Sequence, residues 1–376
     1  MDQDRHYMQL ALELAEKARG RTSPNPMVGA VLVKDGEVVG KGFHVKAGSA
    51  HAEVVALTDA GERAKGATAY VTLEPCCHYG RTGPCTEALL KAGVKKVVVA
   101  MKDPNPLVAG QGLAILREAG LEVESGLLEE EAVRLNEVFL KYITTKRPFV
   151  VMKAATSLDG KIATATGESK WITGAAAREY GHRLRDTYDA ILVGVTTILA
   201  DDPSLTARLP EGRGRDPIRI ILDSQARTPT GAKVLIQESA AHTIVATTEA
   251  APVERRASLL AAGAEVLVIP GAGPGVDLVK LMEILGEKQI TSVLIEGGGK
   301  VNGSALTAGI VDKVAWFLAL KIIGGDAAPG PVRGEGVAAL KDATKLYDVA
   351  LERLGEDTLI TGYTSEGGGK NFYRHS

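Results

Sequence analysis

The chain has 376 residues, more than one hydrophobic core usually serves, so two domains are expected. Hydrophobic residues make up 45% and charged residues 24% of the chain, as in ordinary globular proteins, which argues against extended disorder. The formal net charge of −2 provides no overall basic field, so a long nucleic acid is a poor candidate partner. A small phosphorylated substrate needs only a local Arg or Lys cluster.

The ends of the chain and its cysteines indicate a compartment. Residues 1–17 are acidic and helical rather than a basic stretch followed by an apolar core, and no apolar run approaches a membrane span. The three cysteines all lie within residues 76–85, too clustered for a disulfide framework. We therefore expect a cytoplasmic protein with no membrane partner. A homo-oligomer is expected as well, although none of these features indicates it.

The first half of the chain predicts a layered α/β domain with a mixed sheet, because short strands alternate with amphipathic helices. In chain order, the expected elements are a helix at 4–19, hairpin strands at 28–33 and 38–43 around Asp35-Gly36, a helix at 51–65, a strand at 69–73, a helix at 85–91, a strand at 97–101, a helix at 113–119, a strand at 121–124 and a helix at 129–142.

Residues 144–148 interrupt this pattern with polar residues and a proline, which predicts a linker. A second α/β pattern follows, with buried strands expected at 149–154, 190–195, 218–222, 243–246, 266–269 and 293–295. The residues from 365 to 376 have no apolar period and are predicted to fray. The expected domains are therefore 1–145 and 146–364, followed by a tail at 365–376.

The strongest chemical signal is the triplet His51-Ala52-Glu53 followed by Pro75-Cys76 and then Cys85. A catalytic zinc takes three protein ligands and keeps one position open for water, and one imidazole with two thiolates supplies that ligand set. Glu53 then remains available to move protons. This pattern is typical of zinc nucleobase deaminases, although their cysteines are usually spaced Cys-x-x-Cys and here eight residues separate them.

Alternatives stay open for several residues of this region. Cys77 could join His51, Cys76 and Cys85 in a closed structural site, but that arrangement leaves Glu53 without a purpose. His44 and His78 are candidates for contact with substrate or are packed and surface residues. Asn25 lies between two prolines that fix an extended path, so its amide could face a pyrimidine edge or belong to a rigid turn.

Eight segments together resemble the bifunctional riboflavin-biosynthesis deaminase/reductase family, in which the long cysteine spacing also occurs. They are PNPMVGAV (24–31), HAE (51–53), TLEPCCHYGRTGPC (72–85), DPNPLVAGQG (103–112), KAATSLDGKIA (153–163), GESKWITG (167–174), ILADDPSLTAR (198–208) and IEGGG (295–299). The resemblance implies a cytidine-deaminase-like first fold and a dihydrofolate-reductase-like second fold. It also implies two reactions: zinc-dependent deamination of 2,5-diamino-6-ribosylamino-4(3H)-pyrimidinone 5′-phosphate, then NADPH-dependent reduction of the ribosyl group of 5-amino-6-(5-phosphoribosylamino)uracil to ribityl.

The resemblance also implies ligand residues in the second domain. NADPH would be lined by Ala155, Trp171, Thr197, Asp201, Ser224, Gly297, Gly298 and Gly299, and the substrate by Ser169, Arg185, Leu205, Arg208 and Glu296. The glycines follow a buried strand and precede a helix expected from Asn302, where backbone amides can approach a phosphate. Arg185 and Arg208 carry guanidinium forks that suit a ribose phosphate. Lys153 and Asp201 are candidates for proton transfer during reduction.

Two other hypotheses compete with the bifunctional enzyme. In one, a zinc deaminase acts on another base or nucleoside and the C-terminal half is a ligand-sensing module. In the other, zinc only stabilises the fold and there is no catalysis.

Overall fold

Two separate β-sheets organise the chain. The computed structural model describes residues 2–79, 83–105, 108–210, 212, 214–270, 273 and 275–374. Within these, residues up to 146 and residues 369–374 form a first unit, and residues 147–368 form a second unit. No helix in the described part of the chain is long and apolar enough to cross a membrane.

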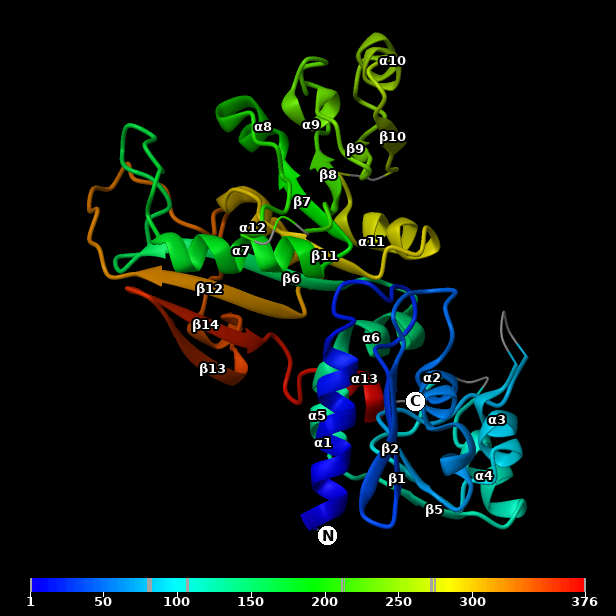
Figure 1. Cartoon of the computed structure of the whole chain (residues 1–376). Helices are drawn as coiled ribbons and strands as arrows, with labels where there is room; N and C mark the ends of the chain where they lie inside the picture. Colours follow the sequence, from blue (N-terminus) through cyan, green and yellow to red (C-terminus); the bar gives the residue numbers. More distant parts are fainter. Residues whose placement is uncertain are drawn as a thin grey trace. The chain divides into compact units, whose positions relative to one another are not determined.

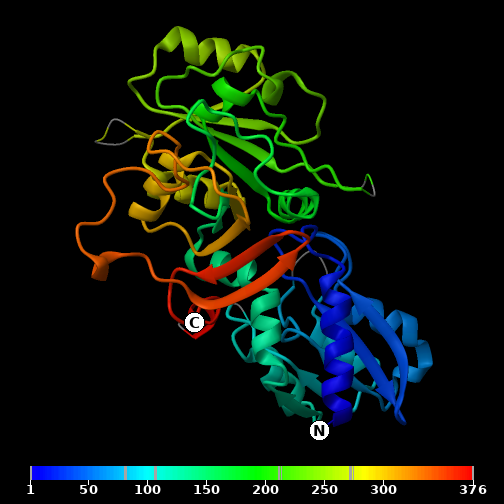
Figure 2. The ribbon, with the colours of Figure 1, turned by 90° about the vertical axis from the view of Figure 1, so that its left-hand side faces the viewer.

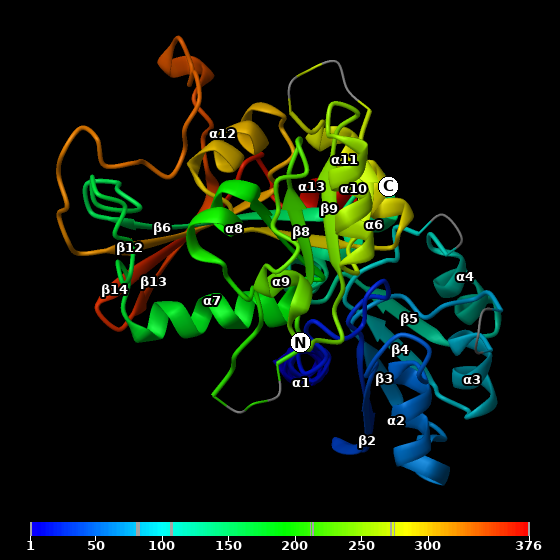
Figure 3. The same ribbon diagram turned by 90° about the horizontal axis from the view of Figure 1, so that it is seen from above.

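The first unit is built on a five-stranded sheet of order β2-β1-β3-β4-β5, in which β1 is antiparallel to β2 and β3 and the remaining neighbours are parallel. Figures 1 and 3 show α1 on one face of this sheet and α2, α3 and α4 on the other. The elements are α1 (Asp2–Glu16), β1 (Gly29–Lys34), β2 (Glu37–Phe43), α2 (Ala52–Ala60), the 3₁₀ turn η1 (Gly61–Ala64), β3 (Thr68–Val71), α3 (Cys85–Lys91), β4 (Lys96–Val99), α4 (Gln111–Glu118), β5 (Glu122–Ser125), α5 (Glu129–Leu135) and α6 (Glu137–Thr145).

Glycine lets the helices approach the hairpin closely. A Cβ atom on Gly29 would lie 1.9 Å from the carbonyl oxygen of Ala11 in α1, and one on Gly42 would lie 2.3 Å from that of Ala52 in α2. Both distances are far below van der Waals contact, so any side chain would push a helix away from the sheet. Because α2 begins at Ala52, the second contact also fixes the position of His51.

The helix predicted at 129–142 is divided into α5 and α6 at Asn136. The buried Asn136 side chain accepts a hydrogen bond from the Met27 N–H at 2.8 Å and donates one to the Met27 carbonyl at 2.9 Å. It therefore ties this helix break to the segment that carries Asn25.

The predicted tail departs from its expected structure. Residues Lys370–Arg374 form a short helix, α13, which packs on α5 and α6 of the first unit. In Figure 2 the red C-terminal helix lies next to the teal-green helices of residues 129–145. A helix this short gains its stability from tertiary contacts, which no apolar period in the sequence reveals.

The second unit holds a nine-stranded sheet within the described residues, of order β10-β9-β8-β7-β11-β6-β12-β14-β13. Its neighbours are parallel from β10 to β12, and β14 and β13 continue as antiparallel strands. The elements are β6 (Phe149–Ser157), α7 (Ala175–Thr187), β7 (Ala190–Gly194), α8 (Val195–Asp201), β8 (Ile218–Leu222), α9 (Lys233–Ile236), β9 (Thr243–Thr247), α10 (Val253–Ala261), β10 (Glu265–Val268), α11 (Leu278–Glu287), β11 (Ser292–Ile295), α12 (Gly299–Thr307), β12 (Lys313–Ala319), the 3₁₀ turn η2 (Leu340–Asp342), β13 (Tyr347–Leu354) and β14 (Asp357–Tyr363).

Alternate residues of the central strands face two different cores. Leu192 and Ile220 belong to the cluster covered by α11 and α12, whereas Ile191 and Ile221 belong to the cluster covered by α8, α9 and α10. A sheet covered on both faces explains why these strands read as continuous apolar runs. The helix expected from Asn302 begins three residues earlier, at Gly299.

Replacing Asn136 with alanine should destabilise the first unit by about 2 kcal/mol, because the Met27 N–H and carbonyl would both lose their partner. Urea unfolding followed by circular dichroism would measure this change. The exposed Thr58→Ala variant serves as the control and should shift the free energy of unfolding by less than about 0.5 kcal/mol. Both tryptophans, Trp171 and Trp316, lie in the second unit, so a shift confined to their fluorescence transition would contradict the prediction.

Candidate functional site

His51, Cys76 and Cys85 meet at one point of the first unit. The Nδ1 atom of His51 lies 3.2 Å from the Cys85 Sγ and 3.4 Å from the Cys76 Sγ, and all three donor atoms lie within 4.8 Å of one another. His51 caps the start of α2, Cys85 opens α3, and Cys76 lies in the loop after β3. The Cys85 backbone N–H points at the Cys76 Sγ at 3.4 Å, a contact that favours a thiolate.

This donor set fits zinc. One imidazole nitrogen and two sulfurs are ligands that zinc prefers, and a site with three protein ligands keeps a fourth position for water or substrate. Among the described residues, the donor group contains these three side chains and no fourth. Cys77 is half-buried but outside the group, and His78 is exposed. The geometry thus favours an open catalytic site over the closed structural one.

The pKa values of the two thiols are shifted in opposite directions. Hydrogen bonds with Cys85 and His51 lower the pKa of Cys76 to about 4 despite its burial. The pKa of Cys85 is raised, first by its hydrogen bond with Cys76 and then by burial. A divalent cation between the sulfurs would favour the ionised form of both groups.

Glu53 lies on α2, two residues after His51, and only 5% of it is exposed. Burial is the main cause that raises its pKa, to about 7, and the nearby Cys76 adds to this. A carboxyl group with such a pKa can both accept and release a proton near neutral pH. Glu53 is not part of the ligand group, so it remains available for that task.

Asn25 and His44 form a hydrogen-bonded pair in the same unit. The Nδ1 of the buried His44 lies 3.1 Å from the Ala50 carbonyl oxygen, and its Nε2 lies 3.1 Å from the Asn25 amide nitrogen. Because a carbonyl oxygen only accepts, Nδ1 carries the proton and Nε2 accepts the hydrogen bond from Asn25. This arrangement orients the amide with its oxygen away from His44. The His44 ring also contacts the His51 ring edge-on, with centroids 5.6 Å apart.

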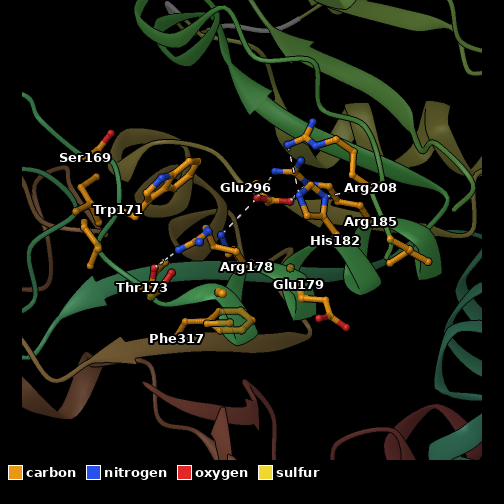
Figure 4. Close-up of a pocket in the computed structure, with 18 of the residues that line it drawn as sticks. Ser169, Trp171, Thr173, Arg178, Glu179, His182, Arg185, Arg208, Glu296 and Phe317 are labelled. Carbon is orange, nitrogen blue, oxygen red and sulfur yellow. Dashed lines mark hydrogen bonds and ion pairs between the residues drawn. The ribbon is translucent and has the colours of Figure 1, made fainter. Parts of the chain in front are cut away.

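A second candidate site is a cavity of about 650 Å³ in the second unit, shown in Figure 4. Seven residues predicted to bind cofactor or substrate, or to transfer a proton, line it: Lys153, Ala155, Ser169, Trp171, Arg185, Arg208 and Glu296. The sequence reasoning missed other lining residues, among them Arg178 and His182. His182 follows Arg178 by four residues and precedes Arg185 by three, so all three lie on one face of α7. This helical spacing could have been read from the sequence.

A buried ion-pair cluster dominates the charge of this cavity. The Arg185 guanidinium donates to both carboxyl oxygens of Glu296, at 2.6 and 3.0 Å, and the Lys153 ammonium lies 3.4 Å from the same group. Burial alone would raise the pKa of Glu296, but the charges of Arg185 and Lys153 outweigh it and hold the pKa at about 2. The Arg185 fork is therefore occupied by Glu296 in this structure, whereas we expected it to face a phosphate.

The remaining predicted ligands lie outside this cavity. Thr197 follows β7, Ser224 follows β8 and Gly297–Gly299 follow β11, and because these three strands are parallel, their carboxyl ends meet at one sheet edge. A Cβ atom on Gly298 would lie 3.9 Å from the Thr197 hydroxyl oxygen. The edge thus gathers most of the predicted NADPH residues.

Leu205 and Asp201 are placed differently. The Leu205 side chain is buried in the core under α8 and α9, so only its backbone is available to a substrate. Asp201 ends α8 with an exposed side chain and is not among the residues that line the cavity, whereas Lys153 is. The two candidates for proton transfer are therefore not brought to the same cavity.

Family models match both halves of the chain. The model of the cytidine and deoxycytidylate deaminase zinc-binding region matches residues 1–101, and that of the RibD C-terminal domain matches residues 148–360. The riboflavin biosynthesis protein RibD of Actinobacillus pleuropneumoniae is 48% identical over 95% of this chain and 94% of its own length. The chain belongs to the RibD family.

Solved structures of RibD proteins cover both units. Acinetobacter baumannii RibD superposes with a TM-score of 0.85 at 42% identity, covering 96% of this chain and 99% of its own. A Thermotoga maritima deaminase/reductase gives 0.84 at 38% identity, with the same coverage. Membership of the RibD family confirms the two predicted folds and a bifunctional deaminase and reductase of riboflavin biosynthesis, against the deaminase with a sensing module. It also confirms zinc and NADPH as the cofactors.

Serine at position 76 or 85 should lower the zinc content of the purified protein, because each change removes one sulfur from the donor group. Cys77→Ser is the matched control and should keep about one zinc per chain, since its sulfur lies outside that group. Metal analysis by mass spectrometry measures the content. Loss of zinc from the Cys77 variant alone would show that the ligands are wrongly assigned.

Glu296 should make the second unit sensitive to acid. Because its pKa is about 2 in the fold and ordinarily 4.5, the unfolded chain takes up the proton first as the pH falls. Its contribution is present above pH 4.5 and is lost as the pH falls towards 2. The free energy of unfolding should therefore drop between pH 6 and pH 3 by about 2 kcal/mol more in the unchanged protein than in Glu296→Gln. Equal drops, measured by urea unfolding and tryptophan fluorescence, would contradict this.

Proposed function

We propose that the first unit deaminates 2,5-diamino-6-ribosylamino-4(3H)-pyrimidinone 5′-phosphate, and that the second reduces the ribosyl group of 5-amino-6-(5-phosphoribosylamino)uracil to ribityl. The Thermotoga maritima relative is named for this pair of activities. The observation that carries the proposal is the meeting of His51, Cys76 and Cys85 beside the buried Glu53. The cavity around Glu296 supports the second activity.

In the deamination, the oxygen of water replaces the amine on the ring carbon and ammonia leaves. Zinc held by His51, Cys76 and Cys85 would make the water more acidic. Glu53 accepts a proton from the water and delivers it to the departing nitrogen, a transfer that suits a carboxyl pKa of about 7. The Asn25 amide, oriented by His44, offers its oxygen to an N–H group on the pyrimidine edge.

In the reduction, a hydride adds to C1′ of the ribosyl group, and the ring oxygen that is released takes a proton. NADPH supplies the hydride when bound at the sheet edge that carries Thr197, Ser224 and the 297–299 glycines. Lys153 lines the cavity with its ammonium group 3.4 Å from Glu296, and we assign it as the proton donor. Asp201 does not line the cavity, so we assign it to cofactor binding.

The substrate phosphate is assigned to Arg208 and Ser169. Both line the cavity, and the exposed Arg208 guanidinium donates a hydrogen bond to the Thr206 hydroxyl at 3.0 Å and lies 3.4 Å from the His182 Nε2. Arg185 and Glu296 are joined by two hydrogen bonds and form a rigid pair. We assign the polar atoms of this pair to contacts with the substrate hydroxyls. Leu205 contributes through its backbone.

Two further properties belong to the proposal. We assign a cytoplasmic location, because three clustered free thiols suit a reducing compartment and a metal site. We also expect a homo-oligomer, which light scattering of the purified protein would detect.

Replacing Glu53 with glutamine tests the proposal. The variant should lose ammonia release from the diaminopyrimidine substrate by about a hundredfold or more, because it cannot move the proton. Zinc content should stay unchanged, since Glu53 is not a ligand. Consumption of NADPH with the deaminated substrate should also stay unchanged and acts as the internal control. Undiminished ammonia release would remove Glu53 from the reaction, and no NADPH consumption in the unchanged protein would refute the reductase assignment.

A further inference from the structure

The C-terminal helix α13 contacts three parts of the first unit through different side chains. The Lys370 ammonium lies 2.7 Å from the Glu130 carboxyl group on α5, and the Lys141 ammonium of α6 lies 4.7 Å from the centre of the Phe372 ring. The Phe372 and Tyr373 side chains pack half-buried against the core of this unit. The helix is therefore a component of the first unit, although it follows the whole second unit in sequence.

The Tyr373 hydroxyl joins α5 to the segment that follows β4. It donates a hydrogen bond to Glu129 at 2.9 Å and accepts one from the Lys102 backbone N–H at 3.2 Å. Burial and the hydrogen bond to Glu129 raise the pKa of Tyr373 to about 12, so the hydroxyl keeps its proton at neutral pH. One oxygen thus acts as donor and acceptor at the same time.

Met101 and Asp103, the residues on either side of Lys102, are both hydrogen-bonded to Glu74. The Glu74 N–H donates to the Met101 carbonyl at 3.0 Å, and the Asp103 N–H donates to a Glu74 carboxyl oxygen at 3.1 Å. These hydrogen bonds fix Met101 and Asp103 to Glu74, and the Tyr373 hydroxyl accepts the N–H of Lys102 between them.

Glu74 stands two residues before Cys76 in the sequence. Glu74 also accepts the N–H groups of Gly110 and Leu113, at 3.0 and 3.2 Å, so it binds the start of α4 as well. A Cβ atom on Gly112 would lie 2.2 Å from the Pro75 carbonyl oxygen, which shows how closely α4 packs on the segment leading to Cys76. A shift of residues 101–105 would therefore be transmitted through Glu74 to the segment that leads to Cys76.

We propose that Tyr373 is a positioning residue for deamination. Its hydroxyl holds residues 101–105 in place, and these residues in turn hold, through Glu74, the segment that carries Cys76. This inference rests on the proposed deaminase function. Tyr373 itself does not touch the reacting groups. Its role is to keep the loop beside the donor group in one arrangement.

The test compares Tyr373→Phe, which removes only the hydroxyl, with the unchanged full-length protein. Hydrogen exchange followed by mass spectrometry should show the Lys102 amide exchanging about fivefold faster, the effect of one neutral hydrogen bond. The kcat/KM for ammonia release should fall by about the same factor. Zinc content should be unchanged, and the rate of NADPH consumption should be unchanged because Tyr373 lies in the other unit.

Two matched variants sharpen the result. Tyr347→Phe removes a hydroxyl from β13 in the second unit, and Lys370→Ala removes the contact of α13 with Glu130 without touching Lys102. Both should leave exchange at Lys102 near that of the unchanged protein. Unaltered exchange in Tyr373→Phe, or an equal fall in both enzyme activities, would overturn the positioning role. Absence of ammonia release from the unchanged protein would instead refute the proposed function, and the exchange result would still show whether Tyr373 braces the loop.

Discussion

The convergence of one imidazole and two sulfurs is the constraint on which the first unit depends. His51, Cys76 and Cys85 belong to the start of α2, the loop after β3 and the start of α3, so three elements must be placed together to within a fraction of an ångström. The glycines of the hairpin allow α2 to approach the sheet, and the Glu74 carboxyl group binds the loop on the other side. Metal binding adds free energy to this arrangement, since an unfolded chain has no such site.

The second unit solves a different electrostatic problem. It keeps the Glu296 carboxyl group almost fully buried by surrounding it with Arg185 and Lys153. Ion pairs of this kind contribute little net stability, because desolvation offsets most of the attraction, but they are rigid. A cavity lined by such a cluster presents fixed polar atoms without a large net charge, which leaves Arg208 as the more accessible cation for an anionic group.

The sequence indicated three metal donors that the structure brings together, because zinc chemistry dictates residue types as well as spacing. Strands buried on both faces were also predicted, since their apolar runs leave few alternatives. It did not predict the last three strands, β12, β13 and β14, of which β13 is exposed at the sheet edge and gives no alternating pattern. Nor did it predict the division of α5 from α6, which depends on the contact of Asn136 with Met27 more than a hundred residues away. The pairing of Arg185 with Glu296 was equally invisible, because it joins α7 to the end of β11.

The return of α13 to the first unit makes the reductase an insertion within the deaminase in terms of chain order. A growing polypeptide would therefore complete residues 147–368 before α13 leaves the ribosome. The first unit consequently gains this helix only after the second unit has been synthesised. Separating them by cutting the chain at residue 146 would yield a deaminase fragment that lacks its final helix.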